Sequence, residues 1–189
     1  MQTSPTEFDL RRVLTIRQPW AFLIIRPDLP AGSPERQEWL ASPLRKDVEN
    51  RKTMHSYRGE LHIHAGLQVD EAAKQDLWRS FPEIGPALAA WNASHDQRGG
   101  IIGKVRMTDS VRAHPSLWFG GPVGWVLEEP EILPFEKLRG MQGIYRAGDV
   151  PLTNAQLADR IQKEGDSVRG RIASMMQPSR KRNAVFFKQ

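Results

Sequence analysis

The chain has 189 residues, of which 39% are hydrophobic and 26% are charged. This balance is typical of a folded protein and excludes a disordered polyelectrolyte, and the length suits one domain with an appendage. Lysine and arginine total 27 against 22 for aspartate and glutamate, which gives a net charge of +5. That excess suits a polyanionic partner without identifying one.

The chain contains no cysteine, which excludes disulfides, thiolate metal sites and cysteine nucleophiles. No apolar run approaches the roughly 18 residues that a membrane helix needs, and the N-terminus shows no secretory signal pattern. We therefore expect a cytoplasmic protein that does not contact a membrane.

The first elements are predicted from alternation and from proline. Residues 1–11 are expected to form a flexible N-terminus, and residues 12–16 alternate well enough for a first strand. Pro19 suits the first turn of a short helix over residues 20–26. The proline-rich stretch over residues 27–34 then ends that helix.

The middle of the chain is predicted to hold two strands followed by two helices. The strands are expected over residues 47–51 and 60–65. Asp70 can cap a helix over residues 71–80, and residues 82–91 favour another helix. These helices would form an excursion between strands.

The last part of the chain changes from strands to helices. Strands are expected over residues 100–108 and 123–128. A capping box at Thr153 predicts a helix to residue 164, and a second helix is expected over residues 167–176. Strands interrupted by helices indicate an α+β fold and exclude a pure β-sandwich or a regular βαβ series.

One predicted strand is more polar than folding requires. In residues 46–51, Lys-Asp-Val-Glu-Asn-Arg, only Val48 is apolar, although a strand with one buried face alternates. One interpretation is an exposed edge strand whose charges pair with one another. The other is a site in which Lys46, Glu49 and Arg51 converge on an anionic or hydrogen-bonding ligand.

Several short segments occur in a fixed order around this strand. They are Leu14-Thr15-Ile16-Arg17-Gln18-Pro19-Trp20-Ala21, Tyr57-Arg58-Gly59, Ile63-His64-Ala65-Gly66, Gly124-Trp125-Val126-Leu127 and Gly140-Met141-Gln142-Gly143-Ile144-Tyr145. Together with the strand, they resemble the ASCH domain family, whose founding member is a eukaryotic transcription coactivator. The resemblance spans roughly residues 12–146, and it implies a PUA-like mixed β-barrel decorated by helices.

The resemblance also implies a domain organisation. It predicts an ASCH domain over residues 12–150, followed by a helical, basic C-terminal extension over residues 151–189. Residues 27–45 form an insertion, because family members are much shorter there. The family has a glycine two residues before the lysine, whereas Leu44 stands in that place.

The expected ligand cleft combines residues from several of these segments. Arg17 and Gln18 do not belong in a core unless they are paired, which favours a site. Trp20 either stacks on a base or packs in the core. The resemblance adds His64 as a cleft-wall or barrel residue and Trp125 as a further candidate. The predicted ligand-binding set is therefore Arg17, Gln18, Trp20, Lys46, Glu49, Arg51, His64 and Trp125.

Two other kinds of site need to be considered. His62 and His64 share one strand face with Glu60, but no distant ligand completes a metal-binding pattern, so neither a metal nor a cofactor is expected. The C-terminal basic residues would either form a solvated end or contact a nucleic-acid backbone. These residues are Arg169, Arg171, Arg180, Lys181 and Arg182.

The sequence leaves three classes of function open. The first is binding of nucleic acid, most naturally RNA, with a nucleotide or base in the polar cleft. The second is a hydrolase acting on a modified nucleoside or RNA, with Lys46 as base or nucleophile and Glu49 as proton carrier. One family branch is such a nucleoside amidohydrolase, although it has threonine in the place of Glu49. The third is an adaptor that binds a protein partner through the insertion and the C-terminal helices.

Overall fold

The computed structural model describes residues 9–93, 97–154 and positions 158, 161, 162, 166 and 169. The chain divides into two units, residues 1–150 and residues 151–189. In the second unit, the described positions from 154 onward are helical, and the rest of both predicted C-terminal helices lies outside the described residues. Residues 1–8 of the predicted flexible N-terminus also lie outside them.

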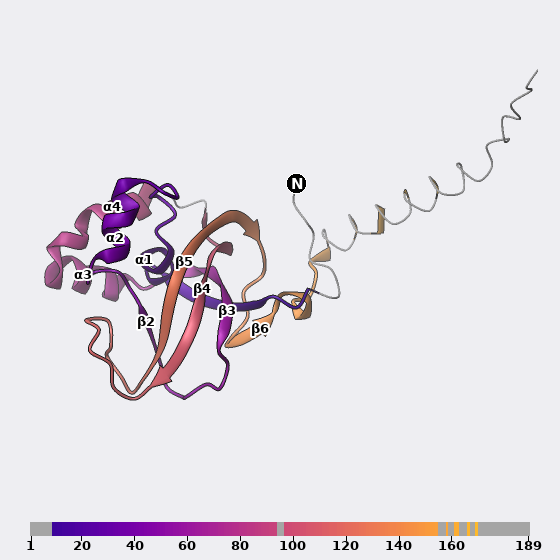
Figure 1. Cartoon of the computed structure of the whole chain (residues 1–189). Helices are drawn as coiled ribbons and strands as arrows, with labels where there is room; N and C mark the ends of the chain where they lie inside the picture. The colour runs from indigo at the N-terminus through magenta and orange to yellow at the C-terminus, as the bar shows by residue number, and fades with distance from the viewer. Residues whose placement is uncertain are drawn as a thin grey trace, which may run out of the picture. The chain divides into compact units, whose positions relative to one another are not determined.

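The first unit is built on one six-stranded sheet (Figure 1). Its strand order is β2-β5-β4-β3-β1-β6, and β1 runs parallel to β3 while the other neighbours are antiparallel. The strands are β1 (Arg12–Gln18), β2 (Val48–Arg51), β3 (Gly59–Val69), β4 (Gly100–Val111), β5 (Val123–Lys137) and β6 (Ile144–Arg146). The predicted α+β class is confirmed.

Four helices accompany the sheet, and Figure 1 shows α2, α3 and α4 grouped on one side of it. They are α1 (Trp20–Ile25), α2 (Pro34–Ala41), α3 (Glu71–Ser80) and α4 (Gly85–Ala93). Asp70 caps α3 as expected, because its side chain accepts a hydrogen bond from the Ala73 amide at 3.0 Å. The predicted helix over 82–91 is instead a 3-10 turn, Pro82–Ile84, followed by α4. Helix α2 lies in the insertion, where no element was predicted.

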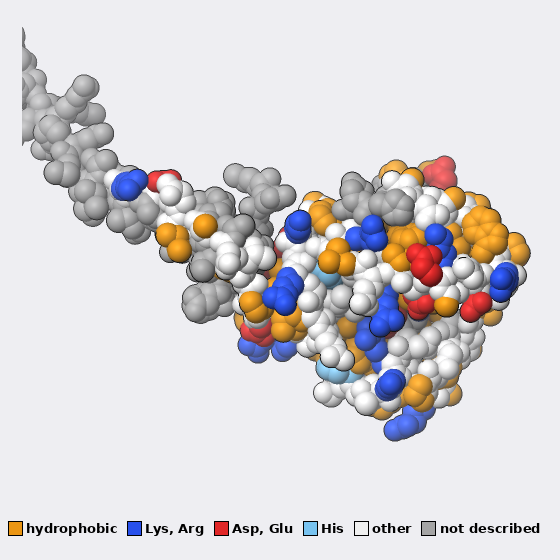
Figure 2. Space-filling model, turned by 180° about the vertical axis from the view of Figure 1, so that it is seen from behind, with side chains coloured by type: hydrophobic (Ala, Val, Ile, Leu, Met, Phe, Trp, Pro, Cys, Tyr) orange, Lys and Arg blue, Asp and Glu red, His pale blue; other side chains and the backbone are white. Residues whose placement is uncertain are grey.

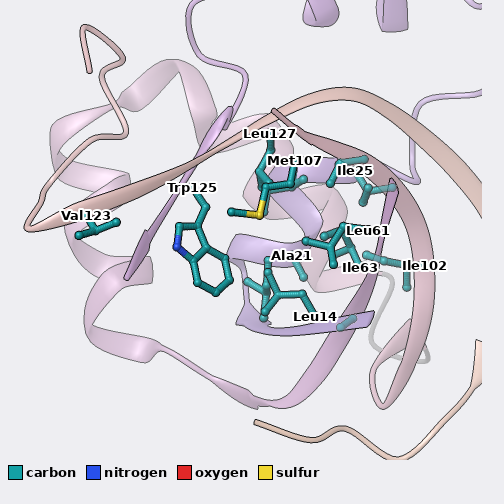
Figure 3. Packing of buried hydrophobic residues seen from close by; sticks show 14 residues of the cluster. Leu14, Ala21, Ile25, Leu61, Ile63, Ile102, Met107, Val123, Trp125 and Leu127 are labelled. Atoms are coloured by element: carbon teal, nitrogen blue, oxygen red, sulfur yellow. The ribbon is translucent and has the colours of Figure 1, made fainter. Parts of the chain in front are cut away.

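The main hydrophobic core lies inside the curve of the sheet (Figure 3). Leu14 from β1, Met107 from β4 and Trp125 from β5 all project into it. Val13, on the other face of β1, packs in a separate cluster with Tyr145. Both faces of β1 are therefore covered, which fits its place inside the sheet rather than at the edge.

The sheet curls until strands far apart in its order approach one another. Arg51, on the edge strand β2, donates a hydrogen bond to the Thr15 carbonyl of β1 at 3.5 Å. Register shifts interrupt the pairing of β4 with β5 at three points, and such irregularities bend strands. The curvature brings β2 and the start of α1 to the same end of the core.

Candidate functional site

A pocket of about 470 Å³ opens where β2, α1, α3 and the loop before β5 meet. Its volume falls in the usual range for small-molecule sites. The lining residues combine aromatic rings with a few polar groups. They are Trp20, Lys46, Glu49, Asn50, Ala73, Asp76, Leu77, Ser80, Phe81, Leu117, Trp118, Phe119 and Gly120.

Lys46 is the most unusual of these residues, because its side chain is only 3% exposed. Its Nζ donates a hydrogen bond to the Val48 carbonyl at 2.6 Å and lies 3.6 Å from the Glu49 carboxylate. The same amine lies 4.9 Å from the centre of the Trp20 ring and 5.5 Å from that of Trp118. A cation near two indole faces gains cation–π attraction, which increases when water is excluded.

Burial lowers the pKa of Lys46, because removing an ammonium from water disfavours its charged form. The nearby Glu49 carboxylate opposes this shift without reversing it. A buried lysine with a lowered pKa can act as a hydrogen-bond donor, a general base or a nucleophile.

Glu49 links Lys46 to Arg51. The Arg51 guanidinium lies 3.2 Å from the other carboxylate oxygen, so Glu49 is shared between two cations. The Arg51 guanidinium also lies 5.2 Å from the centre of the Trp125 ring. Residues 49 and 51 do share a strand face, as the alternation predicted, and their charges pair with one another there. This pairing is expected both of an exposed edge strand whose charges pair and of a ligand site, so it does not decide between these two interpretations.

Aromatic rings form the walls of the pocket. Trp20 and Trp118 meet edge to face, with ring centres 6.1 Å apart and planes 82° apart. Phe81 tilts against Trp118 with ring centres 5.8 Å apart. Trp20 packs against the core clusters, which is one of the two roles considered from the sequence, and it also borders the pocket, whereas stacking on a base stays a prediction.

The position of Trp118 depends on Asn50 of β2. The Asn50 amide donates to the Trp118 carbonyl at 2.8 Å, and its oxygen accepts from the Gly120 amide at 3.0 Å. Asp47 adds a contact to the Ser116 hydroxyl at 2.5 Å. Neither Asn50 nor Trp118 was among the residues predicted to bind the ligand. The available signal was an amide side chain beside Lys46 and Glu49 in a strand that needs none.

The pocket unites three predicted ligand-binding residues, Trp20, Lys46 and Glu49. The others lie elsewhere: Gln18 is buried with its side-chain oxygen accepting from the Phe22 amide at 3.1 Å, and Arg17 is exposed. Arg51 contacts Glu49 but does not line the pocket. Gln18 thus supports the start of α1 and only indirectly the pocket.

Trp125 and His64 are also placed away from the pocket. Trp125 is buried, and its indole N–H donates to the Thr53 carbonyl at 3.2 Å. His64 is buried with Nε2 at 2.8 Å from the Leu138 carbonyl, and burial lowers its pKa. His64 therefore contacts the backbone inside the fold and does not line this pocket.

The other candidate sites are less well formed. His62 lies 4.0 Å from Glu60, and among the described residues no cluster of three His, Asp or Glu side chains could hold a metal ion. Arg169 is exposed and lies 3.8 Å from Asp166. Arg171, Arg180, Lys181 and Arg182 lie outside the described residues. No helix in the described part of the chain is both long and apolar enough to cross a membrane.

Comparison with known families and with curated proteins found no family model and no curated protein that matches this chain.

Proposed function

We propose that the first unit is an ASCH-type domain that binds a nucleotide of RNA, with the base in the pocket beside Lys46. The observation that carries this proposal is the buried Lys46 amine, which lies close to both the Trp20 and Trp118 rings and near the Glu49 carboxylate. A base offers a flat ring for aromatic contact and polar edges for a cation and a carboxylate. The pocket provides all three types of partner.

Two further features support a nucleotide as the ligand. The Trp118 indole N–H is buried and has no acceptor among the described residues. Buried donors normally have a partner, and a turn of the Trp118 ring would bring this N–H to a base oxygen or nitrogen in the pocket. Aromatic contact with a base contributes about 1–3 kcal/mol and requires a base that is out of its stack. Single-stranded or extruded nucleotides are therefore the expected ligands.

The charge distribution suits a polyanionic partner. Figure 2 shows basic side chains spread over one face of the first unit with acidic ones among them. The whole chain carries a net charge of +5. Affinity for RNA should then fall steeply as the salt concentration rises, because each neutralised phosphate releases counterions.

The PUA-like barrel is part of the same proposal. Arg51 of β2 reaches the Thr15 carbonyl of β1, and side chains from both ends of the strand order share one core. These contacts support a sheet that curls toward closure, as expected of a small barrel.

A hydrolase is the second candidate, and the lowered pKa of Lys46 favours it. A neutral Lys46 amine could take a proton from water or attack an acyl carbon, with Glu49 carrying the proton. Binding and hydrolysis would use the same pocket, so both are tested by one experiment.

The experiment compares the wild type with Lys46→Met, which removes the charge and keeps a chain of similar length. Single-stranded RNA and a panel of modified nucleosides are titrated at two salt concentrations, and the mixtures are analysed by mass spectrometry. Lys104→Met is the matched control, because Lys104 is on β4 and does not border the pocket.

We expect salt-sensitive RNA binding that Lys46→Met weakens about tenfold and Lys104→Met reduces far less. A nucleoside product formed by the wild type and absent with Lys46→Met would establish the hydrolase instead. Equal binding by the wild type and Lys46→Met, with no product from either, would contradict both functions of the pocket.

A further inference from the structure

The insertion builds a second concave site that the nucleotide proposal does not use. A groove of about 520 Å³ lies between α1, residues 27–45 and the segment from the 3-10 turn into α4. We call it the insertion groove. It is lined by Leu23, Arg26, Leu29, Glu35, Glu38, Trp39, Ala41, Ser42, Leu44, Glu83, Ile84 and Ala87.

The wall of this groove is held rigidly by Arg36 of α2. Arg36 is only 4% exposed and donates to the carbonyls of Ile25 at 3.0 Å, Arg26 at 3.2 Å and Pro130 at 2.8 Å. The Ser33 hydroxyl caps α2 by accepting from the Arg36 amide at 3.2 Å. The groove is thus formed before any partner arrives, which lowers the entropy cost of binding.

The groove has an apolar floor and an acidic rim. Leu23, Trp39 and Ile84 contribute to the floor, and the exposed Glu35, Glu38 and Glu83 lie around it. Within the described part of the chain, none of these three glutamates pairs with a basic side chain. This local charge is opposite in sign to the net charge of the whole chain.

Among the described residues that line the groove, Arg26 is the one cation, and it already has a partner. Arg26 pairs with Asp28 at 2.8 Å, and its guanidinium lies 5.6 Å from the Phe22 ring centre and 5.7 Å from that of Trp39. The rim therefore offers negative charge to a ligand and no free positive charge. Such a rim repels a nucleic-acid backbone and attracts lysine and arginine.

We propose that the insertion groove binds a basic, amphipathic segment of a partner protein. Apolar side chains of the segment would occupy the floor over Leu23, Trp39 and Ile84. Its lysine or arginine residues would meet the three rim glutamates. Docking of an amphipathic helix into a groove of this kind is a common mode of peptide recognition. The groove shares no lining residue with the Lys46 pocket.

The test uses the full chain and three synthetic peptides with helical spacing. One peptide is basic and amphipathic, one has the same apolar residues with glutamate replacing lysine, and one keeps the lysines but has serine in place of the apolar residues. Binding is measured by fluorescence anisotropy. The Trp39 indole resonance, assigned with Trp39→Phe, reports whether the groove is occupied.

The groove variant is Glu38→Lys with Glu83→Lys. Its matched control is Glu71→Lys with Glu128→Lys, which changes the net charge equally at exposed acids outside the groove. We expect only the basic amphipathic peptide to bind and to shift the Trp39 resonance. The groove variant should weaken this binding about tenfold, and the control should leave it nearly unchanged.

Several results would overturn the proposal. They are failure of the basic amphipathic peptide to bind, equal binding of the acidic peptide, and equal weakening by both double variants. A dimer in sedimentation that only the groove variant abolishes would assign the groove to a second copy of the chain instead. A Trp39 shift caused by single-stranded RNA would assign it to nucleic acid.

Discussion

Arg36 and Lys46 are both almost fully buried cations, yet their surroundings differ in kind. Arg36 is 4% exposed and Lys46 is 3% exposed. The Arg36 guanidinium donates to three backbone carbonyls, so its planar fork is largely satisfied by the fold. Lys46 makes one carbonyl hydrogen bond, lies 3.6 Å from a carboxylate and borders a pocket.

The comparison separates a cation that bonds mainly to backbone carbonyls from one that borders a pocket. A buried charge costs free energy unless its donors find partners, and Arg36 places three of its N–H groups on the chain's own carbonyls. An ammonium has three donors, and the described contacts of Lys46 occupy two of them with a carbonyl and a more distant carboxylate. The remaining donor is available to a ligand in the pocket.

Arg36→Met provides the most severe test of this difference. The substitution leaves the Ile25, Arg26 and Pro130 carbonyls without their donor, so we expect the free energy of unfolding to fall by about 3 kcal/mol. Urea denaturation measures this loss. RNA affinity at the Lys46 pocket, measured where the variant is folded, should stay close to that of the wild type. Loss of RNA affinity without loss of stability would reverse the two roles.

Lys46→Met should affect stability much less. The substitution removes an ammonium whose burial is costly, and Glu49 keeps its contact with Arg51 at 3.2 Å. Removing one partner of a buried ion pair is costly when it leaves the other charge unpaired, and Arg51 prevents that here, so we expect a change within about 1 kcal/mol of the wild type. A loss as large as that of Arg36→Met in the same denaturation experiment would show that Lys46 is primarily structural.

Much of this fold follows from local sequence patterns, and the exceptions have physical causes. Alternation located β1, while β2 and β3 were both expected close to their observed positions, and Asp70 located the start of α3. Helix α2 was missed although Ser33 and Pro34 are a good N-cap and first helical residue, because the surrounding prolines suggested an irregular loop. The second half of β5 was missed because neither of its faces is fully buried, so its residues do not alternate.

The pocket was predicted only in part for a similar reason. Lys46 and Glu49 are close in sequence, and Trp20 belongs to a recognisable segment. Trp118 and Phe81 enter from a loop and a helix end far along the chain, where no period marks which face will meet β2. Which aromatic rings surround a buried lysine is decided by tertiary packing, and a single sequence does not encode that in any local pattern.

The pH dependence of stability gives a finer test. The pKa of Lys46 lies below its ordinary value of 10.5 in the folded state, so the unfolded chain binds more protons between the two pKa values. The free energy of unfolding therefore rises with pH between the folded and the unfolded pKa of Lys46. Below the folded pKa, burial of the charged amine destabilises the protein by its full amount. We expect the stability of the wild type relative to Lys46→Met to be higher at pH 10 than at pH 7, by denaturation. A difference that does not change with pH would mean that the Lys46 pKa is not lowered.

The smallest expected effect concerns the support of Arg36. Ser33→Ala removes the cap of α2, whereas Asp70→Ala removes the equivalent cap of α3, and each should lower the free energy of unfolding by about 1 kcal/mol.

The two variants should differ in where the structure loosens. Because the Ser33 hydroxyl accepts from the Arg36 amide, Ser33→Ala should speed hydrogen exchange in α2 and weaken binding of the basic amphipathic peptide to the insertion groove. Asp70→Ala should loosen α3, which borders the Lys46 pocket through Ala73 and Leu77, and leave the groove unchanged. If either variant speeds hydrogen exchange equally in α2 and α3, the two helices are coupled. The insertion groove and the Lys46 pocket would then not respond separately to a local change.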